Sequence, residues 1–136
     1  MATDRFESQE TQDDIAGLND NFGIKKVVLN SASMSLPEGV TLLGENSYVK
    51  TGRIVNLLVN LQITSTTKHQ FLITNFIPNV KDRPALDTSN ALGDGVPDGI
   101  AQPVNIKAAG TLELWNTKTG TTYVQGNIIY IANDTD

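Results

Sequence analysis

Aliphatic side chains recur at every second position in Val55-Asn56-Leu57-Leu58-Val59-Asn60-Leu61-Gln62-Ile63, and polar residues fill most of the positions between them. Successive side chains of a strand point to opposite faces, so this period predicts one long β-strand with an apolar face. Nine residues at about 3.3 Å each span roughly 30 Å, enough to cross a small domain. Leu58 interrupts the polar face, which indicates that a second surface or a neighbouring subunit covers part of it. We therefore expect a central strand with which the other segments pair.

The composition is that of one acidic domain. A chain of 136 residues with 39% hydrophobic content can bury one modest core and is too short for two. The 10 Lys and Arg residues against 15 Asp and Glu residues give a net charge of −5, which disfavours nucleic acids and anionic membranes as partners. The absence of cysteine excludes disulfides, thiolate zinc sites and a cysteine nucleophile.

The sequence shows no targeting or membrane-spanning segment. No apolar run in it approaches a membrane span, which needs roughly 20 residues. The first residues, Met1–Phe6, lack the basic region and apolar core of a secretion signal. We therefore expect a soluble chain that inserts into no membrane.

Residues 1–23 differ in composition from the rest of the chain. Among many acidic residues, three apolar ones have the spacing of a single helical stripe. They are Ile15, Leu18 and Phe22. Thr11 suits an N-cap and Gly23 a helix stop. Because a helix of about twelve residues is marginal alone, it is expected to pack on the β domain, form a short trimeric seam, or insert as a peg into a larger assembly. We interpret residues 1–23 as an attachment segment and residues 24–136 as a β domain.

The remainder of the chain has the pattern of strands. Apolar or alternating runs are separated by turn residues such as Pro37-Glu38-Gly39 and Thr51-Gly52. Besides the central strand, the expected strands are Ile24–Leu29, Val40–Leu43, Ser47–Lys50, Gln70–Thr74, Val104–Ala108, Thr111–Asn116, Thr121–Val124 and Gly126–Ala132. Thr64–Lys68 and Pro78–Pro103 are expected to be loops, the second with room for a short strand. Short connections favour antiparallel pairing, so the predicted fold is all-β, an antiparallel β-barrel or jelly-roll-like sandwich.

Several segments follow one another in an order known from a protein family. Val49-Lys50-Thr51-Gly52-Arg53-Ile54-Val55 leads into the central strand, and Phe71–Pro78 precedes Arg83-Pro84. The chain then continues with Val104-Asn105-Ile106, Gly110–Leu114 and Gly126–Tyr130. Across residues 47–132, this succession resembles the head domain of bacteriophage tail-tip receptor-binding proteins, in which a GxVxL strand leads to an LPxxxRP turn, an isoleucine strand, a Gly turn and a last strand ending in an aromatic residue.

The resemblance implies a function and a place in the virion. It implies a homotrimer of antiparallel barrel or jelly-roll heads, which is made in the host cytoplasm and lies in the virion at the phage tail tip or baseplate. Its partners would be other tail and baseplate proteins and a cell-wall polysaccharide of a Gram-positive host. Two departures leave a second role open: a short predicted helix stands where the family has a long shaft, and the loop Lys81–Gln102 is longer than the pattern expects. That second role is a structural accessory of the virion, docked through the N-terminal helix.

A carbohydrate-binding or hydrolytic module is a third interpretation. Glycoside hydrolysis requires two carboxylates placed across the scissile bond. Glu113 is expected to point outward beside Trp115, and the sequence places no second acid opposite it. We therefore expect a protein that is not an enzyme and needs no cofactor.

The candidate saccharide-binding residues are Trp115, Tyr123, Glu113, His69 and Arg83. Trp115 lies opposite the Leu112 and Leu114 face of its strand, so it points outward, either as a platform for a sugar ring or as a contact at a rim or subunit interface. Tyr123 alternates with Thr122 and Val124 on the next expected strand and is expected near Trp115.

His69 and Arg83 each allow two interpretations. His69 is the only histidine, so it cannot build a zinc site alone. It is either an ordinary solvated residue or a hydrogen-bonding partner of a ligand hydroxyl. Arg83, between Asp82 and Pro84, is expected to form an inter-strand or inter-subunit salt bridge, with saccharide contact through its planar donor fork as the alternative.

One stretch weakly resembles a calcium loop. Between residues 87 and 99 the oxygen-bearing side chains Asn90, Asp94 and Asp98 alternate with other residues, and Ca²⁺ takes six to eight oxygen ligands. Leu92 occupies a position where a carboxylate would be needed. The alternative is a turn cluster of Gly, Pro and Asp.

Overall fold

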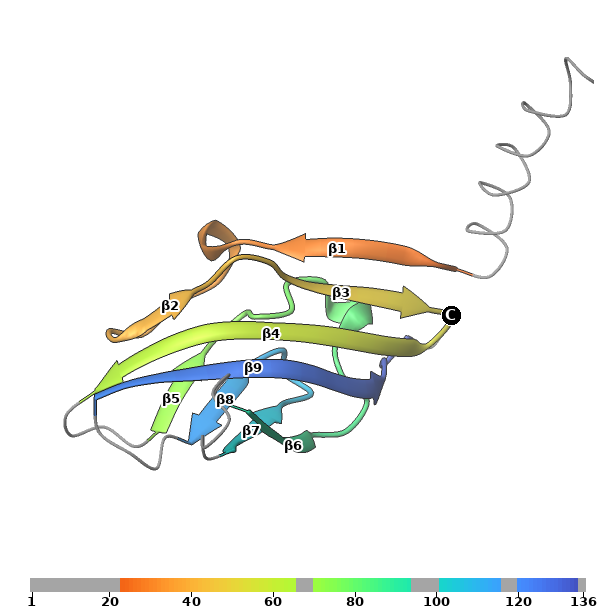
Figure 1. Cartoon of the computed structure of the whole chain (residues 1–136). Helices are drawn as coiled ribbons and strands as arrows, with labels where there is room; N and C mark the ends of the chain where they lie inside the picture. Colours follow the sequence, from red (N-terminus) through yellow and green to blue (C-terminus); the bar gives the residue numbers. More distant parts are fainter. Residues whose placement is uncertain (1–22, 66–69, 94–100, 116–119, 135–136) are drawn as a thin grey trace, which may run out of the picture.

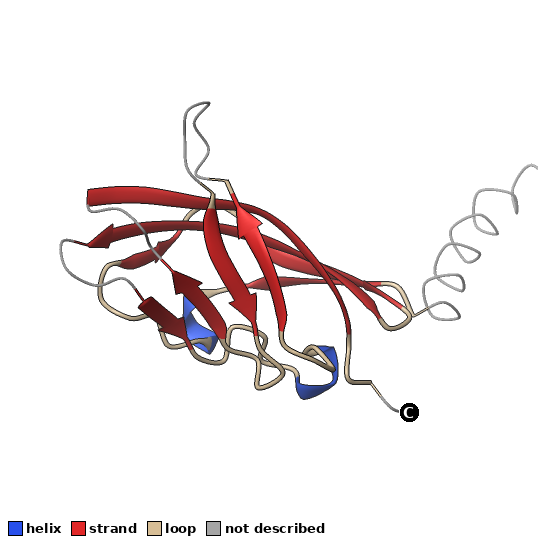
Figure 2. Ribbon diagram, turned by 90° about the horizontal axis from the view of Figure 1, so that it is seen from below, coloured by secondary structure: helices blue, strands red, loops and turns tan. Residues whose placement is uncertain are grey.

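Two antiparallel β-sheets face each other in the computed structural model (Figure 1), which describes residues 23–65, 70–93, 101–115 and 120–134. The strands are β1 (Lys25–Leu29), β2 (Val40–Leu42), β3 (Asn46–Thr51), β4 (Ile54–Ser65), β5 (Gln70–Ile73), β6 (Thr88–Leu92), β7 (Gln102–Ile106), β8 (Leu112–Trp115) and β9 (Gly120–Ile131). Figure 2 shows two short helical turns in the connections, which are the 3-10 helices Ser31–Ser33 and Val80–Asp82. The predicted helix with Ile15, Leu18 and Phe22, and also His69, Asp94 and Asp98, lie outside the described residues.

The predicted central strand is confirmed as β4. Its alternate side chains Val55, Leu57, Val59, Leu61 and Ile63 are fully buried. β9 pairs with β4 along its whole length, while β3 and β2 follow one another along the opposite edge and β1 lies outside β3. Leu58 points outward and is half-buried.

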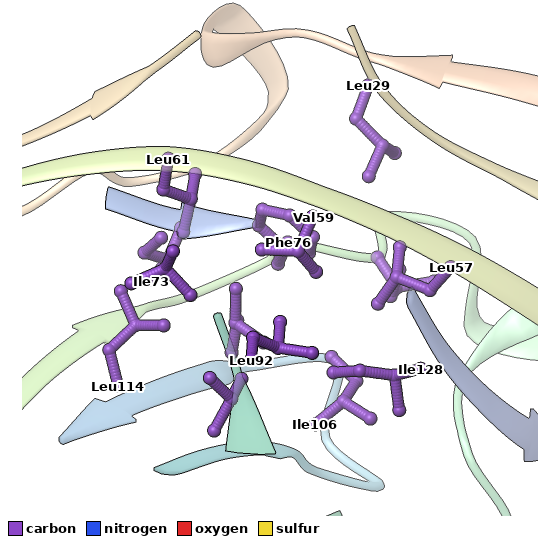
Figure 3. Packing of buried hydrophobic residues seen from close by; sticks show 14 of the residues in the cluster. Leu29, Leu57, Val59, Leu61, Ile73, Phe76, Leu92, Ile106, Leu114 and Ile128 are labelled. Carbon is purple, nitrogen blue, oxygen red and sulfur yellow. The ribbon is translucent and has the colours of Figure 1, made fainter. Parts of the chain in front are cut away.

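The second sheet has the strand order β5-β8-β7-β6, with every neighbour antiparallel. Its inward side chains meet those of the first sheet in one continuous hydrophobic cluster. Figure 3 shows Leu61 of β4 packing near Ile73 and Leu114, and Leu57 near Ile128. One core therefore holds both sheets together, as expected for an all-β domain of this size.

Isolated bridges connect the sheets at their edges. Pro84 pairs with Ala132 and Gly93 with Gln125, on either side of the place where β6 runs beside β9. The Asn90 side-chain amide donates to the Asn127 carbonyl oxygen at 3.0 Å. These contacts occupy part of the free edge of β9, which limits its pairing with other chains.

Two sequence predictions of strand limits are wrong. Thr121–Ala132 was expected to contain two strands, yet β9 is one strand of 12 residues. Gly126 does not interrupt it, because the missing side chain makes room for Leu92, whose Cδ2 would lie 3.0 Å from a Cβ at this position. Thr64 and Ser65 were expected in a loop, but they continue β4 opposite Thr121 and Gly120.

Asn46 bridges the gap between β2 and β3 along the edge of β4. Its side-chain amide donates to the Asn60 carbonyl oxygen at 2.9 Å and its Oδ1 accepts from the Asn60 N–H at 2.6 Å. The Asn46 side chain is buried and so replaces a missing stretch of neighbouring strand. Without it, the Asn60 N–H would be left unsatisfied, whereas the Asn60 carbonyl oxygen would keep the 2.9 Å bond from the Leu43 N–H.

We expect Asn46→Ala to lower the free energy of unfolding by about 1 to 3 kcal/mol, because it leaves the Asn60 N–H unsatisfied and one such group costs about 1 to 3 kcal/mol. Urea denaturation measures this change. Asn127→Ala is the matched control: its exposed amide also joins two strands, by a 3.0 Å bond to Asn56, and its removal should cost about 0.5 kcal/mol or less. Equal losses in both variants would contradict the role of Asn46.

Candidate functional site

The long pair of β4 and β9 gives the domain two ends. Ile54 pairs with Ile131 at one end, where the chain enters at Gly23 beside Gly52; we call this the attachment end. Ser65 pairs with Gly120 at the other, which we call the distal end. Figure 1 shows β5 beginning and β8 ending toward the distal end.

Trp115 lies near the distal end, on the outer face of the second sheet. The prediction that it points outward is confirmed, since its residue is 41% exposed while Leu112 and Leu114 are fully buried. The indole Nε1–H donates to Glu113 Oε1 at 3.1 Å, and the Gln70 amide donates to Glu113 Oε2 at 3.1 Å. Glu113 thus holds the edge of the exposed indole by a hydrogen bond.

Polar side chains share the outer face of the second sheet with Trp115. The register places Leu72 of β5, Glu113 of β8, Asn105 of β7 and Ser89 of β6 in one row across the outer face. Lys107 Nζ lies 4.0 Å from Glu113 Oε2 and partly balances its charge. We call the six outward residues Gln70, Leu72, Ser89, Asn105, Glu113 and Trp115 the Trp115 face. The face combines an aromatic plane with amide, hydroxyl and carboxylate groups.

Tyr123 does not join the Trp115 face. It lies on β9 of the first sheet, opposite Gln62, and points outward. Trp115 points outward from the other sheet, so the two rings lie on opposite faces of the sandwich. The expectation that Tyr123 lies near Trp115 is therefore wrong. Strands adjacent in sequence usually pair, but here the chain crosses from one sheet to the other between β8 and β9.

Arg83 supports a turn and makes no salt bridge within the described residues. Its Nε–H donates to the Ile77 carbonyl oxygen and its guanidinium to Asn75 Oδ1, both at 2.9 Å. A side chain on Gly110 would overlap the guanidinium, and Gly110 has a φ of +86°. The predicted ion pair at this position belongs instead to Asp82.

Asp82 is a buried carboxylate at the attachment end that sequence reasoning missed. It lies 2.9 Å from Lys50 Nζ and 2.8 Å from Lys25 Nζ, and Tyr48 donates its hydroxyl hydrogen to it. The Tyr130 hydroxyl donates to the Asp82 carbonyl oxygen at 2.6 Å, and Lys50 also pairs with Asp134 at 2.8 Å. The alternation that buries Tyr48 also points Lys50 inward. This inward lysine was the only feature of the sequence that indicated a buried ion pair.

These contacts set the ionisation of the cluster. Burial raises the pKa of Asp82, but hydrogen bonds from Lys25, Tyr48 and Lys50 and the charge of Lys50 outweigh it, so the pKa is held below its usual range. Burial lowers the pKa of Lys50, but Asp134 and Asp82 raise it above the usual value. Burial raises the pKa of Tyr48, and the bond to Asp82 adds to this effect, so the phenol stays protonated. The cluster is therefore an ionised network with no group poised for proton transfer near neutral pH.

Because the folded-state pKa of Asp82 is depressed, its stabilisation is complete above the ordinary carboxylate value near 4 and disappears as the pH falls through the folded-state value. We expect Asp82→Asn to cost about 3 kcal/mol at pH 7 and to weaken the loss of stability in acid. Thermal unfolding between pH 7 and pH 3 measures both effects. Asp87→Asn is the control, since Asp87 is exposed and the amide oxygen retains the 2.8 Å bond from the Ala108 N–H. A wild-type pH dependence in Asp82→Asn would contradict this assignment.

The described residues contain no group of three or more His, Cys, Asp and Glu side chains that could hold a metal ion. Asn90 belongs to strand β6, its Oδ1 accepts from the Ala91 N–H, and its amide is bonded to β9. The calcium prediction therefore finds no support from Asn90. No helix among the described residues could cross a membrane.

Comparison with models of known protein families and with curated proteins finds no match to this chain. The geometry of the two ends is therefore the basis for assigning a function.

Proposed function

We propose that this protein is a phage tail or baseplate head domain that attaches reversibly to host cell-wall saccharides through the Trp115 face. The observation that carries the proposal is the exposed indole, held at its edge by Glu113 on an outward sheet face near the distal end. The opposite end receives the N-terminal segment, which would join the domain to the virion. The order of strands and turns shared with phage receptor-binding heads supports the same assignment.

The chemistry of the Trp115 face suits a neutral saccharide. The C–H groups of a pyranose ring can pack against an indole plane, while Asn105, Ser89 and the Glu113 carboxylate can bond its hydroxyl groups. The net charge of −5 disfavours a polyanionic wall polymer. An open sheet face gives weak binding per site, so the proposal includes a homotrimer of barrel-like heads, which raises the overall avidity.

A structural accessory role in the virion is the second candidate. The observation that favours it is a set of exposed aliphatic side chains on the first sheet at the attachment end, among them Ile54, Ile129 and Ile131. Such a surface is typical of permanent contacts with other proteins. In this role the attachment segment would dock the domain to a larger particle, and the Trp115 face would have no ligand.

We expect Trp115→Ala to reduce retention of the protein on cells or purified walls of the host at least tenfold, which corresponds to about 1.4 kcal/mol or more. Tyr123→Ala is the matched control, since it removes an exposed aromatic ring from the other sheet and should leave binding unchanged. A glycan array identifies the saccharide. Equal retention of Trp115→Ala and the wild type would contradict the site, and turnover of a saccharide that Glu113→Gln abolishes would show an enzyme instead.

A further inference from the structure

Aliphatic side chains gather on the outer face of the first sheet at the attachment end. The register aligns them in three neighbouring rows across β1, β3, β4 and β9. These residues, which we call the aliphatic face, are Ile24, Val28, Val49, Ile54, Leu58, Ile129 and Ile131. Val28, Ile54, Ile129 and Ile131 are 57% to 64% exposed. Soluble sheets normally present polar residues on a face open to water, so this concentration needs a partner.

The other half of the same sheet face has the opposite character. Toward the distal end, Gln125 donates to Asn60 at 3.0 Å, and Gln62 lies opposite Tyr123 and Thr41. Both halves contain β4 and β9, which are flanked by β3 and β1 in the aliphatic half and by β2 in the other half. The change from amide to aliphatic side chains therefore follows the position along the sheet, and the aliphatic half is the one next to the entry of the chain.

The charges of the aliphatic face permit contact with an identical surface. Lys26 lies within it, opposite Val49, and is paired with Glu45 at 3.1 Å, which lowers the pKa of Glu45. Asn127 and Asn56 satisfy one another by a 3.0 Å hydrogen bond. Two copies meeting here would bring no unpaired like charges together and would leave few polar groups without a hydrogen-bond partner.

The chain outside the described residues points to a second copy as the partner. Residues 1–22 join the domain at Gly23, directly before Ile24 of the aliphatic face. Their apolar stripe of Ile15, Leu18 and Phe22 is narrow, as in a seam between helices of separate chains. A seam between copies would hold their attachment ends near one axis and bring their aliphatic faces together.

We propose that the aliphatic face is a contact between copies of this chain, closed only when residues 1–22 also associate. This inference rests on the proposed trimeric head and adds the surface that forms it. Four strands about 4.8 Å apart and three rows about 6.6 Å apart give a footprint of roughly 14 Å by 13 Å. Stable interfaces bury about 800 Å² per partner. The aliphatic face alone is smaller than this, so the proposed contact requires both the face and residues 1–22.

The first test is the mass of the full chain by light scattering. The wild type is expected to be a trimer. For the double variant Ile54→Lys/Ile129→Lys, the protein concentration at which half of the trimer has dissociated is expected to be at least tenfold higher than for the wild type. Leu86→Lys is the control, since Leu86 is 79% exposed and lies outside the aliphatic face. A monomeric wild type, or a double variant that remains as associated as the control, would overturn the proposal.

The second test does not depend on tolerance of a buried charge. Because the chain has no cysteine, Ile129→Cys introduces a single thiol that a short bis-maleimide can link between copies. Linked copies are expected for Ile129→Cys and not for Leu86→Cys. A monomer whose thiol at 129 is protected would show that residues 1–22 of the same chain cover the face. A monomer with a reactive thiol at 129 would indicate that the partner of the aliphatic face is a different protein. Either result would overturn the proposal.

The two proposals fail separately. Trp115→Ala is expected to remain trimeric while losing wall retention. The dissociated Ile54→Lys/Ile129→Lys variant is expected to keep saccharide binding at single-site strength while losing avidity.

Discussion

The pairing of β4 with β9 is the constraint on which the rest of the structure depends. Each strand has 12 residues, and their register joins the middle of the chain to its C-terminal end. One face of this pair supplies the centre of the core, and the other is an outer surface. Because loop-closure entropy opposes contacts between distant segments, the uninterrupted apolar side of β4 is what makes such a long-range pairing favourable.

Alternation along single strands was predictable because it depends only on local geometry. The period from Val55 to Ile63 identified the central strand, and Leu112 and Leu114 fixed the outward direction of Trp115. The partners of each strand were not predictable in this way. Tyr123 was placed beside Trp115 because their strands are consecutive, whereas the change of sheet between β8 and β9 depends on the packing of the whole core. Gln70 and Asn105 were missed as members of the candidate site because their place beside β8 also depends on which strands pair.

The buried Asp82 cluster shows a second limit of sequence reasoning. Lys50 was predictably inward, but its carboxylate partners lie 32 and 84 residues away in the chain. A buried ion pair adds little net stability compared with an apolar replacement, while loss of one partner is costly. Its evident effect here is positional: Asp82 ties the turn after β5 to β1 and β3, and Lys50 ties the C-terminal residues to the same point.

In the proposed function, this fixed attachment end matters because the domain would bind its ligand at the other end. The β4 and β9 pair separates the aliphatic face from the distal end by much of its length of about 40 Å. The proposed contact between copies at one end would therefore leave the Trp115 faces open, and a common axis would present them from one assembly to one wall. Weak single sites then gain from effective concentration only if each head keeps its orientation relative to its neighbours. The aliphatic face and the Asp82 network both lie at the end where such an orientation would be set.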